Sequence, residues 1–527
     1  MCQVAEYLMK GITLFISPPL LALASDQIRK LRKVTSTRPD FVSLHLDDMQ
    51  LSSIKKVASD LSKMKASPTS ECRAISVVLF ASPQLLIGSK GEPIMDLLLD
   101  KDKSTLHMIV MDEVHLASQF GSTFRNEFKE LKQSLYSRLP NCCSINAFMT
   151  GTCTLEIMRT FESLFGITIN FTHWPSHEEM RHRSVGITLK YTGTPMIEIK
   201  KVIDVTMNGP STSASQKVLI YSNMRDKTIK ISKKVEEYLD IGDDTFTIDV
   251  MVLHGRQTRT QKASYLDFFT SNSTTIDHDV RMLCATSGVA NAGIDSKDVY
   301  CAMRTEFPPS IQDICQEKGR VGRIPFASPD VFTYVICFDI DSYVLLLRRT
   351  LNPEEKMTNS IRKMMASDHI KVAQLFTSIN ACFNHVFEHT MSNPFHQNTE
   401  TPPRVDKCHH CPGCTRELEQ LYGRIVQQGA QDILFAAYTT TSKYSVDDLV
   451  SFISEQEHLD RRLFCRNRAK VPKRDIKLFI FRLIAWEILV PQYIIETKLI
   501  VFLAAKMTEP AMFLFQSINA WNNIHCI

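Results

Sequence analysis

The chain contains 527 residues, of which 44% are hydrophobic and 22% are charged. These fractions are close to the average of globular proteins and exclude a disordered or fibrous protein, and the length predicts about three or four domains. The net charge of +4 allows a nucleic-acid partner without proving one, since 61 Lys and Arg side chains stand against 57 Asp and Glu.

The sequence offers no candidate for a membrane span or a secretion signal. Charged residues interrupt the most apolar region, residues 476–506, whereas a spanning helix needs about 20 predominantly apolar residues in a row. The first ten residues lack the basic start and apolar core of a signal peptide. We therefore expect an intracellular protein, in which the 15 cysteines are thiols or metal ligands rather than disulfides.

Up to residue 338, short apolar runs alternate with helical stretches such as Leu21–Val34 and Thr228–Leu239. Unbroken apolar runs are typical of strands buried on both faces of a parallel sheet, and this alternation is typical of doubly wound α/β domains. The predicted strands are Ile12–Ser17, Ser76–Phe80, His107–Met111, Ile145–Met149, Lys217–Tyr221, Met251–Leu253, Met282–Ala285 and Phe332–Phe338. Eight strands over this length suit two such domains better than one.

The pattern changes after residue 350. Residues 351–390 are predicted to be helical, residues 391–407 form a polar loop with prolines, and a cysteine cluster follows at 408–414. Near the end, a predicted helix over Asp475–Leu489 precedes a predicted hairpin of Gln492–Ile495 and Leu499–Phe502. We expect domains over residues 1–183, 184–350, 351–425 and 430–527.

Two adjacent carboxylates, Asp112 and Glu113, directly follow the predicted strand that ends at Met111. Open α/β sheets bind ligands at the carboxyl ends of their strands. There, Asp112 could hold the Mg²⁺ of a bound nucleotide, and Glu113 could position an attacking water. The alternative is an acidic helix N-terminus favoured by the helix dipole, and the pair alone does not separate the two.

A second motif runs from Gln316 to Arg323 and contains two Gly-Arg pairs. We expect Arg320 and Arg323 to lie on one face at the start of a helix, because they are three residues apart. Two guanidinium groups on one side suit the stabilisation of a transferring phosphate. On this motif alone, a solvated basic turn is only slightly less favoured.

The third motif is Cys-x-x-Cys-x-x-Cys at Cys408, Cys411 and Cys414, with Cys382 lying 26 positions before the first of them. Four thiolates are enough for a closed tetrahedral zinc site, so the spacing predicts zinc. The fourth position has competing candidate ligands, which are His385, His389, His409 and His410.

Taken in order along the chain, these motifs resemble those of RecQ-family DNA helicases of superfamily two. The resembling segments are residues 16–20 with Asp26-Gln27 (motif Ia), 112–115 (the DExH box), 118–125 (the aromatic-rich loop), 150–152 (motif III), 220–223 and 254–255 (motif IV region), 285–286 with 293–295 and Val299 (motif V), and 316–323 (motif VI). Cys382, Cys408, Cys411 and Cys414 fall where the family's zinc-binding subdomain keeps its ligands. The resemblance covers nearly the whole chain.

The resemblance implies two RecA-like doubly wound parallel-sheet domains, then a helical zinc-binding subdomain and a winged helix. It implies an ATP-dependent 3′-to-5′ DNA helicase of repair and recombination, nuclear or chromosome-associated, with ATP, Mg²⁺ and Zn²⁺ as cofactors. Its partner would be single-stranded DNA and forked or tailed duplex DNA. The implied catalytic residues are Asp112, Glu113, His115, Arg320 and Arg323. The resemblance implies ATP binding by Gln316, Gly293 and Asp295, and zinc binding by the four cysteines. It implies DNA contact by Ser17, Phe120, Arg125 and Thr286.

The sequence also departs from the family pattern. It contains no Gly-x-x-x-x-Gly-Lys-Ser/Thr, the loop that grips the β- and γ-phosphates of a nucleotide. We expect a truncated chain or an incomplete gene model that begins just past this loop, and weak ATP binding and hydrolysis by the chain as it stands. Phe120, Ser122 and Ile324 stand where the family usually has Trp, His and Asp. The rival hypothesis is a catalytically inactive DNA-binding or scaffold protein that retains the helicase fold.

A basic strip lies near the C-terminus and contains no acidic residue. It consists of Arg461, Arg462, Arg466, Arg468, Lys470, Lys473 and Arg474. Such a strip could contact DNA phosphates, in which case each contact would add about −0.9 to the slope of log affinity against log salt. A solvated loop explains the strip equally well.

Overall fold

The computed structural model divides into two compact units, and we describe each by itself. Unit 1 comprises Met1–Trp174, Arg256–Phe268 and Val289–Asp295, and unit 2 comprises Pro175–Gly255, Phe269–Gly288 and Ser296–Ile527. The structure describes residues 11–16, 27–28, 31, 41–66, 76–100, 106–115, 127–128, 130–138, 145–170, 185–208, 216–239, 248–271, 280–290, 294, 296, 299–323, 332–351, 359–378, 381–391, 408, 411–415, 418, 446–455, 473–485, 489–494 and 500–505.

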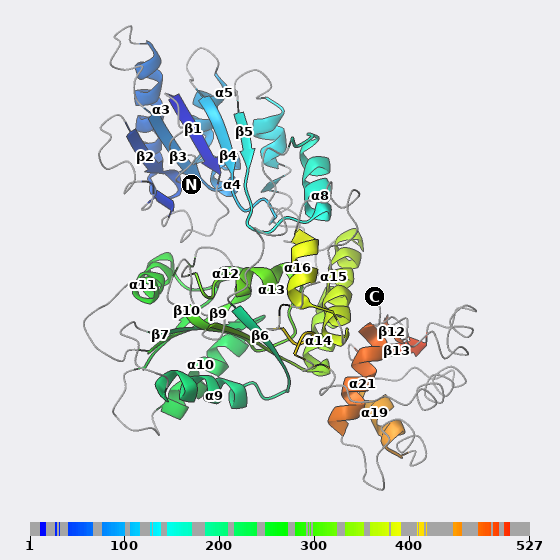
Figure 1. Ribbon diagram of the computed structural model, residues 1–527. Coiled ribbons are helices and arrows are strands. Elements are labelled where there is room, and N and C mark those ends of the chain that lie inside the picture. The colour runs from blue at the N-terminus through cyan, green and yellow to red at the C-terminus, as the bar shows by residue number, and fades with distance from the viewer. Residues whose placement is uncertain are drawn as a thin grey trace. The chain divides into compact units, whose positions relative to one another are not determined.

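Unit 1 contains a five-stranded parallel sheet in the order β2-β3-β1-β4-β5 (Figure 1). Its strands are β1 (Gly11–Ile16), β2 (Phe41–His45), β3 (Ser76–Ala81), β4 (Leu106–Met111) and β5 (Ile145–Phe148). Every residue of β3 is buried, as expected of a strand covered on both faces.

Helical elements cover one face of this sheet and share its apolar core. They are α3 (Leu51–Ala66), α4 (Pro83–Ile87), α5 (Glu92–Leu99), α8 (Leu155–Phe165) and a π-helical turn, η3 (Lys132–Tyr136), while a 3-10 turn, η1 (Leu46–Asp48), follows β2. Ile28 and Leu31 pack on the opposite face, against Phe15, Phe80 and Val110. The ends of β1, β4 and β5 are thereby fixed side by side, and the DExH-like residues follow β4.

Unit 2 contains a six-stranded parallel sheet in the order β6-β11-β10-β7-β9-β8. Its strands are β6 (Val185–Tyr191), β7 (Gln216–Ser222), β8 (Ile248–Leu253), β9 (Val280–Thr286), β10 (Val299–Arg304) and β11 (Phe332–Phe338). Helices α9 (Met196–Asn208) and α10 (Arg225–Leu239) bury Ile199, Ile203, Ile231 and Val235 against one face. Along the chain, α11 (Arg259–Thr270), most of which belongs to unit 1, and α12 (Ser287–Ala290) connect these strands, and α13 (Ile311–Lys318) follows β10.

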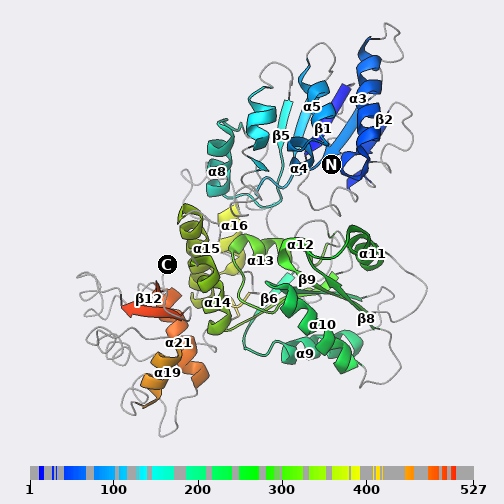
Figure 2. The same ribbon diagram turned by 180° about the vertical axis from the view of Figure 1, so that it is seen from behind.

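Aromatic rings join the sheet of unit 2 to the later helices. Phe307, Phe338, Phe376 and Phe481 form one cluster with ring centroids 4.9 to 6.2 Å apart, within the range of favourable aromatic contacts. The helices are α14 (Ile340–Leu351), α15 (Asn359–Thr377), α16 (Phe383–Met391), α19 (Val446–Glu455) and α21 (Lys473–Ala485). Figure 2 shows α21 beside α14, α15 and α19, in agreement with their contacts.

The predicted α/β class is confirmed, and each of the eight predicted strands is present. Strands β2, β6 and β10 were not predicted. In β6, buried and half-buried residues alternate because it is an edge strand, so its sequence lacks an unbroken apolar run. Helices α15 and α16 lie in the predicted helical region, and of the predicted helix Leu21–Val34 only Gln27, Ile28 and Leu31 lie among the described residues.

The predicted C-terminal helix and hairpin are present as α21 and the antiparallel pair β12 (Leu489–Ile494) and β13 (Ile500–Ala505). A hairpin after a helix is only part of a winged helix, so that assignment and the four-domain division stay predictions. Among the described helices, none has the length and apolar character needed to cross a membrane.

Candidate nucleotide and metal sites

The loop that follows β4 is fixed by the backbone of its neighbouring strands. The N–H of Asp112 donates to the carbonyl of Ile16 at the end of β1, at 3.0 Å, and the N–H of Val114 donates to Met149 after β5, at 3.1 Å. The DExH-like residues are therefore held from both sides at the carboxyl edge of the sheet, where parallel α/β sheets bind ligands.

Both carboxylate oxygens of Asp112 accept hydrogen bonds. The N–H of Glu113 donates to Oδ1 at 2.8 Å, and Nε2 of the buried Gln27 donates to Oδ2. Burial, and next the negative charge of Glu113, raise the pKa of Asp112 to about 6. A bound divalent cation would favour the ionised form, as an opposite charge does. The sequence assigned no role to Gln27, although it lies in the motif Ia-like segment.

Glu113 has a φ of +51° and is the one non-glycine residue with positive φ in the described part of the chain. This left-handed conformation is uncommon for a residue with a side chain. It leaves Oε2 of Glu113 3.2 Å from Nδ1 of the buried His115. The backbone thus turns the Glu113 carboxylate and the imidazole toward each other.

His115 also connects the DExH-like loop to the motif III-like segment, because its Nδ1 lies 2.8 Å from Oγ1 of Thr150. The Thr150 hydroxyl donates its single proton to the carbonyl of Thr152 at 3.1 Å. We therefore assign the imidazole proton to Nδ1, from which Thr150 Oγ1 and Glu113 Oε2 both lie within hydrogen-bonding reach. Asp112, Glu113 and His115 are thus brought together in unit 1.

The motif VI-like segment differs from the prediction. Helix α13 ends at Lys318 and is capped by Gly319, so Arg320 and Arg323 follow a helix rather than begin one. Gly322 reverses the chain with a φ of +64°, and a Cβ there would lie 3.1 Å from the Phe332 ring. The predicted placement on a helix start is wrong because these two glycines end the helix and turn the chain.

Arg323 folds back onto the helix that precedes it. Its Nε donates to the carbonyl of Gly319 at 3.0 Å, which satisfies an acceptor at the helix C-terminus. This bond involves one of the five N–H donors of the guanidinium.

A buried ion pair, not recognised in the sequence, fixes α13 to the sheet. The Arg304 guanidinium at the end of β10 donates to Glu317 of α13, and neither side chain is exposed. Arg304 also donates to Ser287 Oγ at 2.7 Å and to Asn223 Oδ1. One arginine therefore joins the motif IV-like and motif VI-like segments to Ser287, the residue directly after the motif V-like Thr286. The signal in the sequence that could have revealed this ion pair is an arginine at the end of an apolar strand.

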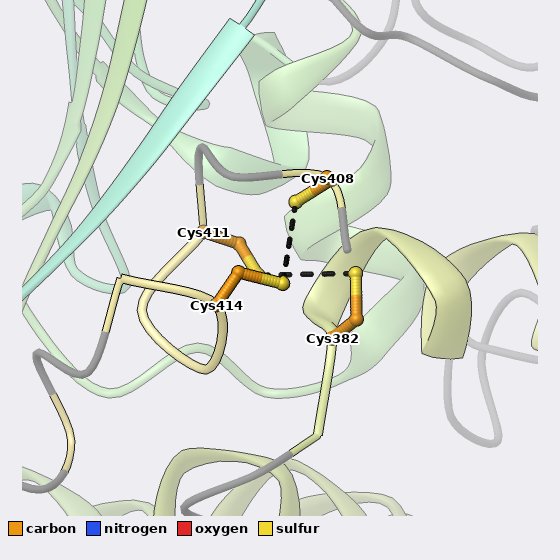
Figure 3. Close-up of side chains that lie close together, drawn as sticks. All are labelled: Cys382, Cys408, Cys411 and Cys414. Carbon is orange, nitrogen blue, oxygen red and sulfur yellow. Dashed lines mark hydrogen bonds between the residues drawn. The ribbon is translucent and has the colours of Figure 1, made fainter. Parts of the chain in front are cut away.

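The four cysteines predicted to bind zinc come together in unit 2 (Figure 3). Their sulfur atoms all lie within 4.8 Å of one another, with 3.8 Å between Cys408 and Cys414 and 4.0 Å between Cys382 and Cys411. A tetrahedron with Zn–S bonds of about 2.3 Å has S···S edges of about 3.8 Å, so the cluster fits zinc.

The backbone around the cluster is built for close approach. A Cβ on Gly413 would lie 1.8 Å from the carbonyl oxygen of Ala381, so only glycine fits where the two cysteine segments meet. The N–H of Phe383 donates to Cys411 Sγ at 3.3 Å. Such N–H···S bonds stabilise thiolate charge and orient a metal ligand.

Residues 198–325 match the family described as Helicase conserved C-terminal domain. ATP-dependent DNA helicase Q-like 5 of Arabidopsis thaliana is 23% identical over 329 residues, which cover 61% of this chain and 30% of that protein. ATP-dependent DNA helicase RecQ of Haemophilus influenzae is 21% identical over 463 residues, which cover 87% of this chain and 64% of the bacterial protein. These matches support the resemblance of this chain to RecQ-family DNA helicases.

The chain spans about a third of the length of its Arabidopsis relative and about two thirds of the bacterial one. Among solved structures, the helicase Lhr of Mycobacterium smegmatis bound to ssDNA and AMP-PNP superposes with a TM-score of 0.43 at 16% identity, over 74% of this chain and 49% of that chain.

Several residues with roles implied by the RecQ resemblance lie outside the described part of the chain. They are Ser17, Phe120, Arg125, Gly293 and Asp295, and their roles stay predictions. Thr286 ends β9 and pairs in register with Ser222 of β7. Gln316 lies in the last turn of α13, half-buried.

The basic strip is described only at Lys473 and Arg474, which begin α21. The Arg474 guanidinium donates to the carbonyl of Tyr191 at 2.9 Å and lies 5.7 Å from the centroid of its ring. Arg474 therefore holds α21 against β6. This structural role differs from the contact with DNA phosphate that the basic strip predicted.

Proposed function

We propose that this chain supplies the catalytic carboxylates, the motif VI arginines and the zinc-binding cysteines of an ATP-driven 3′-to-5′ DNA helicase of the RecQ type. The observation that carries the proposal is the arrangement of Asp112, Glu113 and His115 at the carboxyl edge of a parallel sheet, with His115 hydrogen-bonded to Thr150. The alternative interpretation of Asp112 and Glu113, an acidic helix N-terminus, would not require a hydrogen bond between His115 and Thr150.

Asp112 is suited to hold Mg²⁺, because it presents a hard oxygen ligand at a partly dehydrated edge of the sheet. When bound, Mg²⁺ would neutralise charge on the β- and γ-phosphates of ATP. Glu113 would orient the attacking water and accept its proton, and the Nδ1–H of His115 would hold the Glu113 carboxylate in place.

Arg320 and Arg323 would stabilise the charge that develops on the transferring phosphoryl group. A transferred phosphoryl group spreads its charge over three oxygens, and guanidinium groups match that geometry. The anchoring of Arg323 to Gly319 and of Glu317 to Arg304 supports this role, since both hold the turn that carries the arginines. Gln316, Gly293 and Asp295 would complete the nucleotide contacts.

The zinc module and the C-terminal region would support DNA binding. Cys382, Cys408, Cys411 and Cys414 would hold one structural zinc, because four sulfurs close the coordination sphere and leave no open position for catalysis. Ser17, Phe120, Arg125 and Thr286 would contact DNA with a single-stranded tail. Such a helicase would act on chromosomal DNA, in the nucleus of a eukaryotic cell, during repair and recombination.

The deciding experiment compares the 527-residue chain with the same chain extended by the phosphate-binding loop of a RecQ relative. The extended chain should hydrolyse ATP at about 10 per second when single-stranded DNA is added and should unwind a 3′-tailed duplex. Glu113→Gln in the extended chain should abolish hydrolysis and leave DNA binding intact.

The opposite result would support the rival function, a non-catalytic DNA-binding protein. If the extended chain binds both ATP and DNA tightly yet hydrolyses ATP no faster than its Glu113→Gln variant, the helicase proposal fails.

A further inference from the structure

Helix α13 ends in a buried lysine that contacts α16, the helix that begins directly after Cys382. The Nζ of Lys318 donates a hydrogen bond of 2.5 Å to Oδ1 of Asn384 in α16, and both residues are buried. The ammonium also lies 5.8 Å from the centroid of the Phe387 ring, one turn further along α16, where a cation–π contact adds to the attraction. Lys318 therefore connects α13 to a helix 66 residues later in the chain.

Asn384 lies next to the four-cysteine cluster in sequence and in space. It stands two positions after Cys382 and directly after Phe383, whose N–H donates to Cys411 Sγ at 3.3 Å. This hydrogen bond is stronger to a metal-bound thiolate than to a neutral thiol, because a charged acceptor strengthens it. Metal binding should therefore order the start of α16 and fix Asn384.

At its other end the contact reaches the turn with the two arginines. Lys318 is the last residue of α13, and its carbonyl accepts from the N–H of Val321 at 3.1 Å, inside the turn between Arg320 and Arg323. A displacement of Lys318 would therefore move the backbone from which both arginines project.

We propose that the Lys318–Asn384 hydrogen bond transmits the metal occupancy of the four-cysteine cluster to the turn that carries Arg320 and Arg323. Lys318 is then a positioning residue and does not itself touch nucleotide. The role of the arginines rests on the proposed function, but the dependence of the turn on the metal does not. A buried, charge-assisted hydrogen bond holds its two partners together, so a displacement of Asn384 should shift the end of α13.

The test is amide hydrogen exchange of the full chain, with bound zinc and after zinc is removed by a chelator. Removal should accelerate exchange in residues 381–391 and 408–415, and also by about tenfold in residues 311–323, the effect of losing one buried hydrogen bond. Strands β7 and β9 should exchange as before. The readout needs neither ATP nor DNA, so its result is independent of helicase activity, which is measured separately.

Two variants separate transmission from general loosening. Asn384→Leu removes the acceptor and keeps the volume, so residues 311–323 should exchange fast even with zinc bound, and chelation should add nothing there. Lys318→Met in the same chain replaces the buried ammonium with an apolar side chain, and the double variant should regain protection while staying insensitive to chelation.

Three results would overturn the proposal. Residues 311–323 could keep their protection when zinc is removed from the unaltered chain, or Asn384→Leu could still show the full response to chelation. A purified chain without bound zinc would remove the proposal together with the metal site. If Asn384→Leu does not fold, Lys318→Met alone serves, because its residues 311–323 should not respond to chelation.

Discussion

Arg304 and Glu317 form an ion pair in which both side chains are completely buried. The second carboxylate oxygen of Glu317 accepts from the Tyr334 hydroxyl at 2.6 Å. Burial raises the pKa of Glu317 to about 6, although the charge of Arg304 opposes the rise. The ion pair therefore places two opposite charges in the interior of unit 2, at the point where α13 meets β10.

Removing one partner of this pair should destabilise unit 2 far more than replacing both. Glu317→Gln leaves the Arg304 guanidinium buried without a counter-charge, which costs about 3–5 kcal/mol. The double variant Arg304→Met with Glu317→Leu should recover most of that loss, since apolar residues of similar volume pack without a desolvation cost. Urea unfolding followed by circular dichroism measures both. Equal destabilisation of the single and double variants would contradict this account.

His369 should make the stability of unit 2 dependent on pH. Its Nδ1 donates to the Pro309 carbonyl at 2.6 Å, and its Nε2 accepts from the Thr350 hydroxyl at 2.8 Å, so the ring is held neutral. Burial lowers the pKa of His369 from 6.5 to about 4. Between these values the unfolded chain binds a proton that the folded chain does not, so stability is complete above pH 6.5 and falls as the pH drops toward 4, by about 1.4 kcal/mol per unit.

His369→Gln is the control for this pH dependence, because glutamine can replace one hydrogen bond but does not titrate. The unfolding free energies of the variant and the unaltered chain should differ most at pH 8 and converge toward pH 4. A constant difference over the whole pH range would show that His369 does not titrate in this way.

The four-cysteine cluster should hold about one zinc per chain. Zinc binding supplies folding free energy directly, about 10–16 kcal/mol apparent in small zinc peptides. Cys411→Ser should lose the metal and loosen residues 381–415, while the parallel sheet of unit 2 stays folded. Metal analysis of freshly purified, reduced protein measures the zinc content, and Cys153→Ser, which changes a half-buried cysteine in unit 1, should retain the metal. Full zinc in Cys382→Ser would make His385 the better fourth ligand.

The basic strip should contain residues with two different roles. If Arg466 and Arg468 contact phosphate, replacing both with Ala should weaken DNA binding equally for all sequences. The salt slope should become shallower by about 0.7–0.9 per lost contact. Arg474→Ala should instead lower thermal stability and leave the salt slope unchanged, because Arg474 is bound to Tyr191. Fluorescence titrations of a 3′-tailed duplex at several salt concentrations separate the two. An unaltered slope for the first variant would remove Arg466 and Arg468 from the DNA interface.

The sequence by itself determined the elements whose pattern is local. Apolar runs such as Ser76–Phe80 predicted buried strands, because a strand covered on both faces must be apolar at every position. The Cys408-Cys411-Cys414 spacing predicted a metal cluster, since three ligands so close in sequence can meet in one turn, and the order of the motifs predicted the resemblance to RecQ helicases. Strands with weaker patterns, such as β6, were not predicted, because buried and half-buried residues alternate along an edge strand.

Only the tertiary structure decided which side chains meet. Gln27 reaches Asp112 across 85 residues because β1 and β4 are neighbours in the sheet, and Arg304 meets Glu317 because α13 returns over the end of β10. Arg474 was one charge in a basic strip until its contact with Tyr191 showed that it anchors a helix. Local sequence patterns report burial and periodicity, whereas these pairings depend on strand order and on where helices cross the sheet. Neither is encoded in the residues flanking each side chain.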